Sequence, residues 1–261
     1  MNAEKPDTVL ITGASSGIGL ELARCFAAEG ARLVLVARNT AALESLATEL
    51  RRDHQVESVV LAADLSQLET PGKLFSDLKG RGIGVDILVN NAGFGAYGLF
   101  ADLPLKRQLE MIQVNITALT ELTGLFLPDM IARRRGGVLN VASVAGFVPG
   151  PGMAVYYATK AFVLSYTEAL AAELKNTGVT VSVLCPGPTI TNFGEVAGSK
   201  KAKMFRVSSM SAEAVAKSGL RAFRRHKVVE ISGVKNKLLV CLIRFTPRTL
   251  VRKLARKFNG L

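Results

Sequence analysis

The sequence predicts an α/β protein with a doubly wound parallel sheet and helices on both of its faces. Apolar runs rich in β-branched residues alternate with longer amphipathic stretches over most of the chain. The apolar runs show no strict alternation of apolar and polar residues, as expected for strands whose two faces are both covered. A glycine-rich segment, 13–19, follows the first apolar run directly. These three observations together predict a nucleotide-binding sheet.

The predicted elements follow in chain order. The expected strands are Thr8–Thr12, Arg32–Val36, Ser58–Ala62, Ile87–Val89, Val138–Val141, Val179–Leu184 and Lys227–Ser232. The expected helices are Gly17–Glu29, Thr40–Arg52, Leu68–Leu78, Asn115–Arg134 and Tyr156–Asn176. Gly30 and Gly178 stand where helices are expected to stop. A basic, apolar helical tail over about 235–261 follows the last strand.

Composition excludes several protein classes. Of 261 residues, 49% are hydrophobic and 21% are charged, which is typical of a globular protein and not of a disordered one. No linker or repeat interrupts the pattern, so we expect a single domain over 1–261. Three scattered cysteines and two histidines predict neither a disulfide framework nor a metal site. The polar N-terminus resembles no secretory signal and no apolar run could span a membrane, so we expect a cytoplasmic protein.

The positive charge is concentrated in the last quarter of the chain. From Gly198 to the end there are 17 Lys and Arg but only two acids, Glu213 and Glu230. Two stretches, 235–245 and 248–258, combine bases with apolar residues at helical spacing, which is typical of helices at an anionic membrane surface. Packing of the tail on the domain or at a dimer interface is the alternative, and both stay open here. The tail has few aromatic residues and no recognition motif, so we expect no nucleic-acid partner.

The glycine-rich segment has the features of a phosphate-binding loop. Small residues allow backbone amides to approach a phosphate, and the helix that follows directs its positive N-terminal end to the same point. The spacing Thr-Gly-x-x-x-Gly-x-Gly resembles that of the short-chain dehydrogenase/reductase family, in its compact single-domain branch with the Rossmann fold. The resemblance extends over residues 8–190 at least. It assigns cofactor contacts to Gly13, Ser15, Ser16, Gly17, Ile18 and Gly19.

Residues at the ends of the next strands indicate which cofactor is used. Arg38 stands where an acidic residue would accept the ribose hydroxyls of NAD, and its guanidinium suits the 2′-phosphate of NADP. We therefore expect NADP(H) in preference to NAD(H). The resemblance further implies that Asp64 and Leu65 hold the adenine. It also implies that Asn90, Ala92 and Gly93, from the segment 90–93, stabilise the sheet and line the cofactor site.

Four residues carry the expected chemistry. Tyr156 and Lys160 are four apart in a predicted helix and so share one face, where the lysine ammonium would lower the tyrosine pKa. Ser143 follows the fifth strand, where it can hold a substrate carbonyl. The resemblance implies that Asn115 completes a catalytic tetrad by anchoring a proton relay to the lysine. Tyr157 is three residues before Lys160 and lacks the catalytic spacing, so we expect it to pack or line the pocket.

The remaining predictions concern the substrate. Pro186, Gly187 and Thr189 resemble the segment that covers the nicotinamide, and 188–212 resembles the substrate lid. The apolar residues expected around the pocket are Phe94, Tyr97, Phe147, Val148, Met153 and Phe193. The sequence thus predicts an oxidoreductase that interconverts a hydrophobic carbonyl compound and its alcohol. The resemblance implies that it forms a homodimer or homotetramer. The alternative is a non-catalytic NADP(H) sensor on the same fold.

Overall fold

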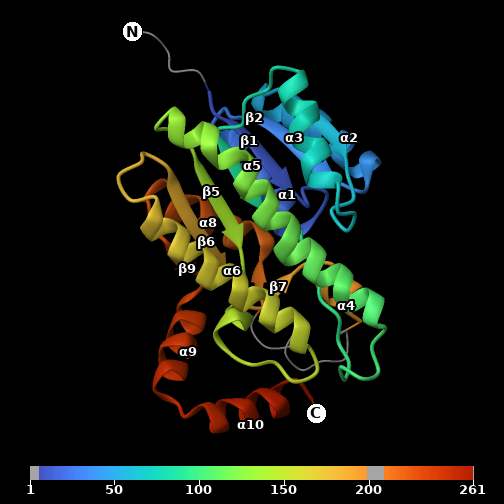
Figure 1. The fold of residues 1–261 in the computed structure, drawn as a ribbon, viewed down its shortest axis with the longest axis vertical. Helices are drawn as coiled ribbons and strands as arrows, with labels where there is room; N and C mark the ends of the chain where they lie inside the picture. Colours follow the sequence, from blue (N-terminus) through green and yellow to red (C-terminus); the bar gives the residue numbers. More distant parts are fainter. Residues whose placement is uncertain (1–5, 199–208, 261) are drawn as a thin grey trace.

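The computed structural model describes residues 6–198 and 209–260 and centres on a sheet of seven parallel strands (Figure 1). The strand order is β3-β2-β1-β4-β5-β6-β9. The strands are β1 (Thr8–Thr12), β2 (Arg32–Ala37), β3 (Ser58–Ala62), β4 (Ile87–Asn90), β5 (Gly137–Val141), β6 (Thr180–Cys185) and β9 (Val229–Ile231). The order of strands reverses between β1 and β4, which places a ligand crevice at their carboxyl ends. The predicted fold class is confirmed.

Helices cover both faces of the sheet. One face carries α1 (Gly17–Ala28), α2 (Thr40–His54) and α8 (Ala212–Arg224), and the other carries α3 (Thr70–Gly80), α5 (Ala118–Ala132) and α6 (Ala154–Glu173). Shorter elements lie between these strands and helices: α4 (Leu105–Ile112), η1 (Gln113–Thr117), η2 (Val144–Phe147), β7 (Thr189–Ile190), α7 (Phe193–Val196) and β8 (Met210–Ser211). Coverage on both sides explains why β1 and β5 are buried along their whole length.

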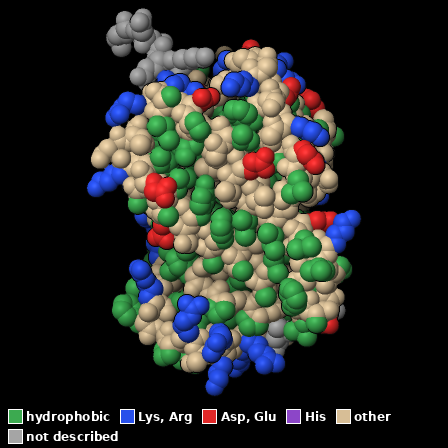
Figure 2. All heavy atoms as spheres, in the orientation of Figure 1, with side chains coloured by type: hydrophobic (Ala, Val, Ile, Leu, Met, Phe, Trp, Pro, Cys, Tyr) green, Lys and Arg blue, Asp and Glu red, His purple; other side chains and the backbone are tan. Residues whose placement is uncertain are grey.

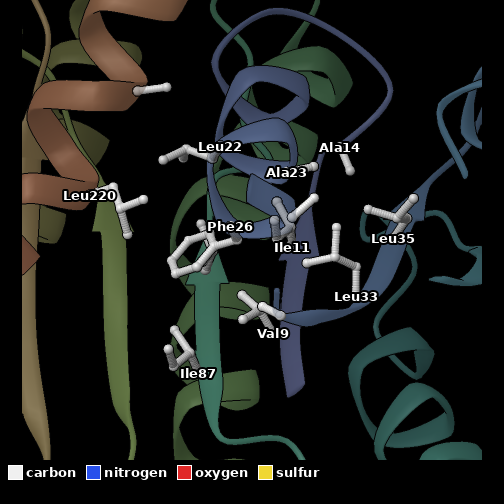
Figure 3. Packing of buried hydrophobic residues seen from close by; sticks show 14 of the residues in the cluster. Val9, Ile11, Ala14, Leu22, Ala23, Phe26, Leu33, Leu35, Ile87 and Leu220 are labelled. Atoms are coloured by element: carbon white, nitrogen blue, oxygen red, sulfur yellow. The ribbon is translucent and has the colours of Figure 1, made fainter. Parts of the chain in front are cut away.

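The apolar face of α1 packs directly on the centre of the sheet. Leu22, Ala23 and Phe26 have helical spacing and contact strand residues such as Val9 and Ile11 (Figure 3). All five side chains are fully buried. Burying each of the larger ones contributes about 1.5–3 kcal/mol. This packing fixes the N-terminal end of α1, and with it the glycine-rich loop.

A buried polar network connects the opposite face of the sheet with two helices. The Asn90 side-chain amide donates to Thr123 of α5 at 3.1 Å and to Asn140 of β5 at 3.0 Å. Asn140 in turn donates to Thr167 of α6 at 2.9 Å. All four residues are buried. Because unpaired polar groups in such a place are costly, the network favours one position of α5 and α6 on the sheet.

Three helices were missed and one was misjudged in the sequence analysis. The structure has α4, α7 and α8 where no helix was predicted. The single helix expected over 115–134 is α5 preceded by a π-helical turn, η1, which carries Asn115. The expected helix over 68–78 begins at Thr70, and the last strand is shorter than predicted. Secondary-structure ends depend on capping and tertiary contacts, which apolar spacing alone does not reveal.

The C-terminal residues form two helices that cross the carboxyl edge of the sheet. We call residues 234–259, with α9 (Val234–Phe245) and α10 (Arg248–Phe258), the C-terminal strap (Figure 1). Its last residue, Asn259, is buried and donates from its side chain to the Pro151 carbonyl at 2.8 Å. The carbonyl of Asn259 accepts from the Tyr97 hydroxyl at 2.5 Å. Within the described ranges, no helix has the length and apolar character needed to cross a membrane.

Candidate active site

A cavity of about 1540 Å³ opens at the carboxyl ends of the strands. Typical small-molecule sites occupy roughly 300–1,000 Å³, so this one has room for a dinucleotide and a second ligand. Most of the predicted site residues line it: Gly13, Ser15, Ser16, Gly17, Ile18, Arg38, Asp64, Leu65, Ala92, Gly93, Ser143, Tyr156, Lys160, Pro186, Gly187 and Thr189. Gly19, Asn90 and Asn115 lie outside the lining.

The glycine-rich loop is shaped by close backbone contacts. Gly13 and Gly17 have φ of 67° and 57°, in the left-handed region that glycine adopts at least cost. The Gly13 amide donates to the Val36 carbonyl at 2.8 Å, which holds the loop against β2. Ser16 stands at the N-cap of α1, yet its side chain makes no capping hydrogen bond. The positive N-terminal end of α1 is therefore directed toward the cavity, which Ser16 also lines.

Asn91 holds the loop in place, a role that the sequence analysis did not assign. Its side-chain amide donates to the Thr12 carbonyl at 2.9 Å and to the Gly13 carbonyl at 3.2 Å. A Cβ on Gly19 would come within 2.3 Å of both that amide and the Gly13 carbonyl oxygen. The absence of a side chain at Gly19 thus leaves room for the Asn91 amide and the Gly13 carbonyl. Asn90 faces the sheet interior, as its network shows, and not the cavity.

The far end of the cavity, beyond β2 and β3, is open and carries Arg38. Arg38 is exposed at the rim and makes no ion pair with any other described residue. The neighbouring Asn39 accepts from the Ala42 amide at 3.1 Å and so caps α2. Asp64 accepts from the Ser66 amide at 3.0 Å, which fixes the turn after β3. The guanidinium is therefore available to an anionic ligand in the cavity.

Tyr156 and Lys160 lie on one face of α6 and are both buried at the cavity wall. Lys160 donates to the Val141 carbonyl at 2.8 Å, and its Nζ lies 5.9 Å from the Tyr156 ring centroid. Burial lowers the pKa of Lys160 to about 8. Burial also raises the pKa of Tyr156, although a hydrogen bond with Ser143 acts in the opposite direction. The net direction of the tyrosine pKa is thus upward, because burial has a larger effect than the lowering expected from the lysine.

Ser143 stands between the end of β5 and the short helix η2. Its hydroxyl oxygen accepts from the Ala145 amide at 3.1 Å and donates to the Pro186 carbonyl at 3.3 Å. The turn after β6 is thereby tied to the turn after β5. Ser143 and Tyr156 consequently present two hydroxyls to the same point of the cavity.

Asn115 lies behind the cavity wall, in the π-helical turn η1. Its side chain donates to the Phe94 carbonyl at 3.0 Å and to the Thr159 hydroxyl at 3.0 Å, and it accepts from the Phe94 amide at 3.1 Å. A Cβ on Gly93 would lie 3.0 Å from Asn115 Oδ1 and 3.4 Å from Lys160 Nζ. Both polar groups therefore approach Gly93. Extra turns of this kind are frequent at functional sites.

Three of the six predicted apolar residues line the cavity and three do not. Phe94, Val148 and Phe193 face it, and the Phe193 ring packs 5.1 Å from that of Tyr156 between centroids. The prediction is wrong for the other three: Tyr97 and Met153 pack in the cluster around Tyr156, and Phe147 packs in the cluster beneath η2. The predicted lid is described over 188–198 and 209–212, where β7 pairs with β8. Its lysine cluster (Lys200, Lys201 and Lys203) lies outside the described residues.

The C-terminal strap forms one wall of the cavity, which the sequence analysis did not foresee. Leu239, Ile243 and Leu254 are among the lining residues it contributes. Tyr157 also lines the cavity, and its hydroxyl donates to Asn259 Oδ1 at 3.4 Å. The helical spacing of the strap's apolar residues was visible in the sequence. The position of that face relative to the cavity depends on contacts between distant segments. No group of three or more His, Cys, Asp or Glu among the described residues is placed to hold a metal ion.

Comparisons with known proteins agree with this geometry. The family model of the short chain dehydrogenase matches residues 7–202. A very-long-chain 3-oxoacyl-CoA reductase of Laccaria bicolor is 37% identical over 188 residues, which are 70% of this chain and 54% of that protein. The matched regions cover only 52–62% of the length of this and similar curated relatives.

Two solved structures share the fold over nearly the whole chain. A short-chain dehydrogenase from Sphingobium yanoikuyae in complex with NADPH has a TM-score of 0.83 and 34% identity, covering 94% of this chain and 95% of that one. A short chain dehydrogenase/reductase from Burkholderia phymatum in complex with NAD has a TM-score of 0.83 and 26% identity, covering 93% and 94%. Similar structures therefore include complexes with each nicotinamide cofactor.

Proposed function

This chain belongs to the short-chain dehydrogenase family, and from that premise we propose that it is an NADP(H)-dependent reductase that converts a hydrophobic ketone or aldehyde reversibly into its alcohol. One observation carries the proposal. Tyr156 and Lys160 are buried on one face of α6, in the same cavity as the glycine-rich loop. The same cavity can thus hold a phosphate-bearing cofactor and a proton donor.

The residues present fit a nicotinamide dinucleotide. The glycine-rich loop and the N-terminal end of α1 suit its pyrophosphate, and Asp64 with Leu65 suits the adenine. Arg38 suits a 2′-phosphate, because it is exposed at the rim with no carboxylate paired to it among the described residues. The turn with Pro186, Gly187 and Thr189 would cover the nicotinamide. When bound, this group supplies or accepts the hydride at the substrate carbon.

Side chains of the cavity would supply the proton that the carbonyl oxygen takes up. Ser143 would donate a hydrogen bond to the carbonyl oxygen and stabilise its developing negative charge. Tyr156 would then give its phenolic proton to that oxygen, so that the carbonyl becomes an alcohol and the tyrosine a phenolate. The phenol carries its proton at neutral pH, because the ordinary pKa of tyrosine is about 10 and burial shifts the pKa of Tyr156 further upward. The Lys160 ammonium would stabilise the phenolate. A proton from solvent would then restore the phenol through the relay that Asn115 is expected to anchor.

Two features favour a hydrophobic substrate of considerable size. Phe94, Val148 and Phe193 surround the position next to Tyr156. The cavity continues along the C-terminal strap, whose lining residues are mostly apolar. A long-chain or polycyclic carbonyl compound would remove this apolar surface from water, whereas a sugar would not. The 3-oxoacyl-CoA reductase among the relatives is consistent with an oxo-acyl chain.

The test compares the wild type with Tyr156→Phe on a panel of carbonyl compounds, from small diketones and aromatic aldehydes to steroid ketones and long-chain 3-oxo lipids. Consumption of NADPH is followed by absorbance. Loss of a positioned general acid is expected to lower turnover by about 10²–10⁴-fold while NADPH binding persists. Tyr157→Phe is the matched control and should retain the chemistry. Tight NADPH binding without turnover of any compound would overturn the proposal in favour of a sensor.

The cofactor preference has its own test. Arg38→Glu replaces the cation at the rim by an anion. Since hydrogen bonds to charged groups contribute about 1.5–3 kcal/mol each, the ratio of kcat/KM for NADPH over NADH should fall by at least about tenfold. An unchanged ratio would show that Arg38 does not select the cofactor.

The proposal also covers the oligomeric state, the domain organisation and the location of the protein. Short-chain dehydrogenases act on small-molecule substrates and are typically oligomeric. We propose a homodimer or homotetramer, since α4 and α6 leave Leu105, Leu109 and Phe162 exposed. A single cofactor-binding domain and a cytoplasmic location belong to the same proposal.

A further inference from the structure

The charged side chains of the C-terminal strap are all basic. No Asp or Glu follows Glu230 in the sequence. Lys237 is neutralised by an ion pair of 3.0 Å with Glu230. Seven other cations of the strap make no ion pair within the described part of the chain: Lys235, Arg244, Arg248, Arg252, Lys253, Arg256 and Lys257. Lys235 and Lys257 line the cavity, and the other five are exposed outside its lining. The strap thus forms a surface of uncompensated positive charge (Figure 2).

Large apolar side chains project from the same two helices. Phe245 is 83% exposed, Leu238 is 60% exposed and Leu250 is 47% exposed. Figure 2 shows hydrophobic side chains beside the basic ones along the edge where α9 and α10 lie. A folded protein in water gains nothing by exposing such a patch, so the patch indicates a binding surface.

We propose that the C-terminal strap is the surface by which this protein binds an anionic lipid bilayer. Basic side chains attract the strap to negatively charged headgroups, and apolar side chains of an interfacial helix insert below them. Phe245 and Leu238 would enter the boundary between headgroups and acyl chains. The cations of α10 would contact the lipid phosphates.

Charge argues against the two other occupants of this surface. In a two-fold dimer built through the strap, the same unpaired cations of both copies would face one another and repel. A nucleic acid would satisfy the cations but would leave the aliphatic side chains beside its phosphates, where they gain no burial. An anionic bilayer satisfies both kinds of side chain.

The strap also connects this surface with the cavity. Leu242 and Leu254 are each 56% exposed, and both line the cavity. Apolar side chains therefore continue from the proposed lipid-facing surface to the wall that the strap contributes to the cavity. A hydrophobic molecule dissolved in the bilayer could enter along them without full exposure to water.

The first experiment measures co-sedimentation with vesicles of phosphatidylcholine, with and without phosphatidylglycerol, at low and moderate salt. We expect binding to the anionic vesicles that weakens with salt. The double variant Arg252→Glu/Arg256→Glu should bind at least about tenfold less tightly. The control is Arg51→Glu/Arg225→Glu, which makes the same change in net charge. Both arginines are exposed at the C-terminal ends of helices, Arg51 in α2 before β3 and Arg225 after α8 and before β9, and so lie away from the strap. The control should bind like the wild type.

A second experiment reports insertion directly. The chain contains no Trp, so Phe245→Trp introduces a single fluorescent reporter. Its emission should shift to the blue with anionic vesicles and be quenched by brominated acyl chains. The control Ile131→Trp places the reporter at the C-terminal end of α5, near the amino ends of the strands and away from the strap. It should show neither change.

Neither experiment depends on turnover, so their failure is distinct from failure of the proposed reaction. The inference is overturned if no anionic vesicle is bound at either salt concentration. Equal loss of binding in both charge variants, or an unshifted Phe245→Trp spectrum, would also overturn it. The same holds if the strap variants change only the oligomeric mass or only the affinity for a nucleic acid.

Discussion

Replacing Gly19 by Ala tests whether the glycine-rich loop is as tightly built as the structure indicates. Gly19 lies in the first turn of α1, and a Cβ there would meet the Gly13 carbonyl oxygen and the Asn91 amide at 2.3 Å each. One of these contacts is to backbone, which cannot rotate away. The other is to the side chain that holds the loop through two hydrogen bonds.

The magnitude follows from three contributions. Overpacking of a dense site costs about 1–3 kcal/mol. Displacing the Asn91 amide removes two hydrogen bonds of about 1 kcal/mol each. Alanine regains about 1 kcal/mol of helix propensity. The free energy of unfolding should therefore fall by about 2–4 kcal/mol, which for a chain of this size lowers Tm by roughly 4–16 °C.

The assay is urea unfolding followed by far-UV circular dichroism, with Gly72→Ala as the matched control. A Cβ on Gly72, in the first turn of α3, would meet only the Glu121 carboxylate at 3.7 Å. The control should therefore gain up to about 1 kcal/mol of stability. If Gly19→Ala were as stable as the wild type, the close approach of loop and helix would be refuted.

Three further predictions follow from burial and hydrogen bonding. Burial lowers the pKa of Lys160 to about 8, whereas lysine in an unfolded chain has a pKa of about 10.4. Between these two pH values the unfolded chain binds more protons than the folded one, so the free energy of unfolding of the wild type should rise with pH relative to that of Lys160→Met. Unfolding curves measured at several pH values check this. Asn259→Ala removes hydrogen bonds to Pro151 and Tyr157, so it should destabilise the strap by about 1–3 kcal/mol and speed amide hydrogen exchange in α10 but not in α1. Burial raises the pKa of the Cys185 thiol to about 12, so a thiol reagent should modify exposed Cys241 first and Cys185 only on unfolding.

Each of these predictions has a result that contradicts it. A pH-independent stability difference would show that Lys160 is not desolvated. Unchanged exchange in α10 after Asn259→Ala would show that the strap is held by its apolar contacts alone. Modification of Cys185 as fast as Cys241 in the native protein would contradict the buried position of β6.

The sheet and most of its helices could be predicted because local patterns encode them. The expected strands coincide closely with the observed ones, since buried parallel strands are continuous apolar runs. α8 was missed although its buried positions Val215, Leu220 and Phe223 have helical spacing. α4 was missed because its Leu105 and Leu109 are exposed, so its pattern does not follow burial.

The site was predictable where a motif carried it and not where tertiary contacts did. The glycine spacing and the Tyr156–Lys160 pair placed most lining residues in advance. Nothing local distinguishes Asn91, which holds the loop, from Asn90, which faces the sheet. Asn259 likewise gives no signal, because its partners are more than a hundred residues away in the chain.

The buried hydrogen-bond network of Asn90 and Asn140 fixes the positions of the catalytic residues from a distance. Thr123 and Thr167 lie about two to three turns along α5 and α6 from the ends that carry Asn115 and Tyr156. Sliding either helix by one turn would move its catalytic end by about 5.4 Å and break the hydrogen bond of Asn90 to Thr123 or that of Asn140 to Thr167. The spacing between the catalytic groups is thus set deep in the sheet, where no substrate reaches. Mutations there can misalign the reaction without altering a single cavity residue.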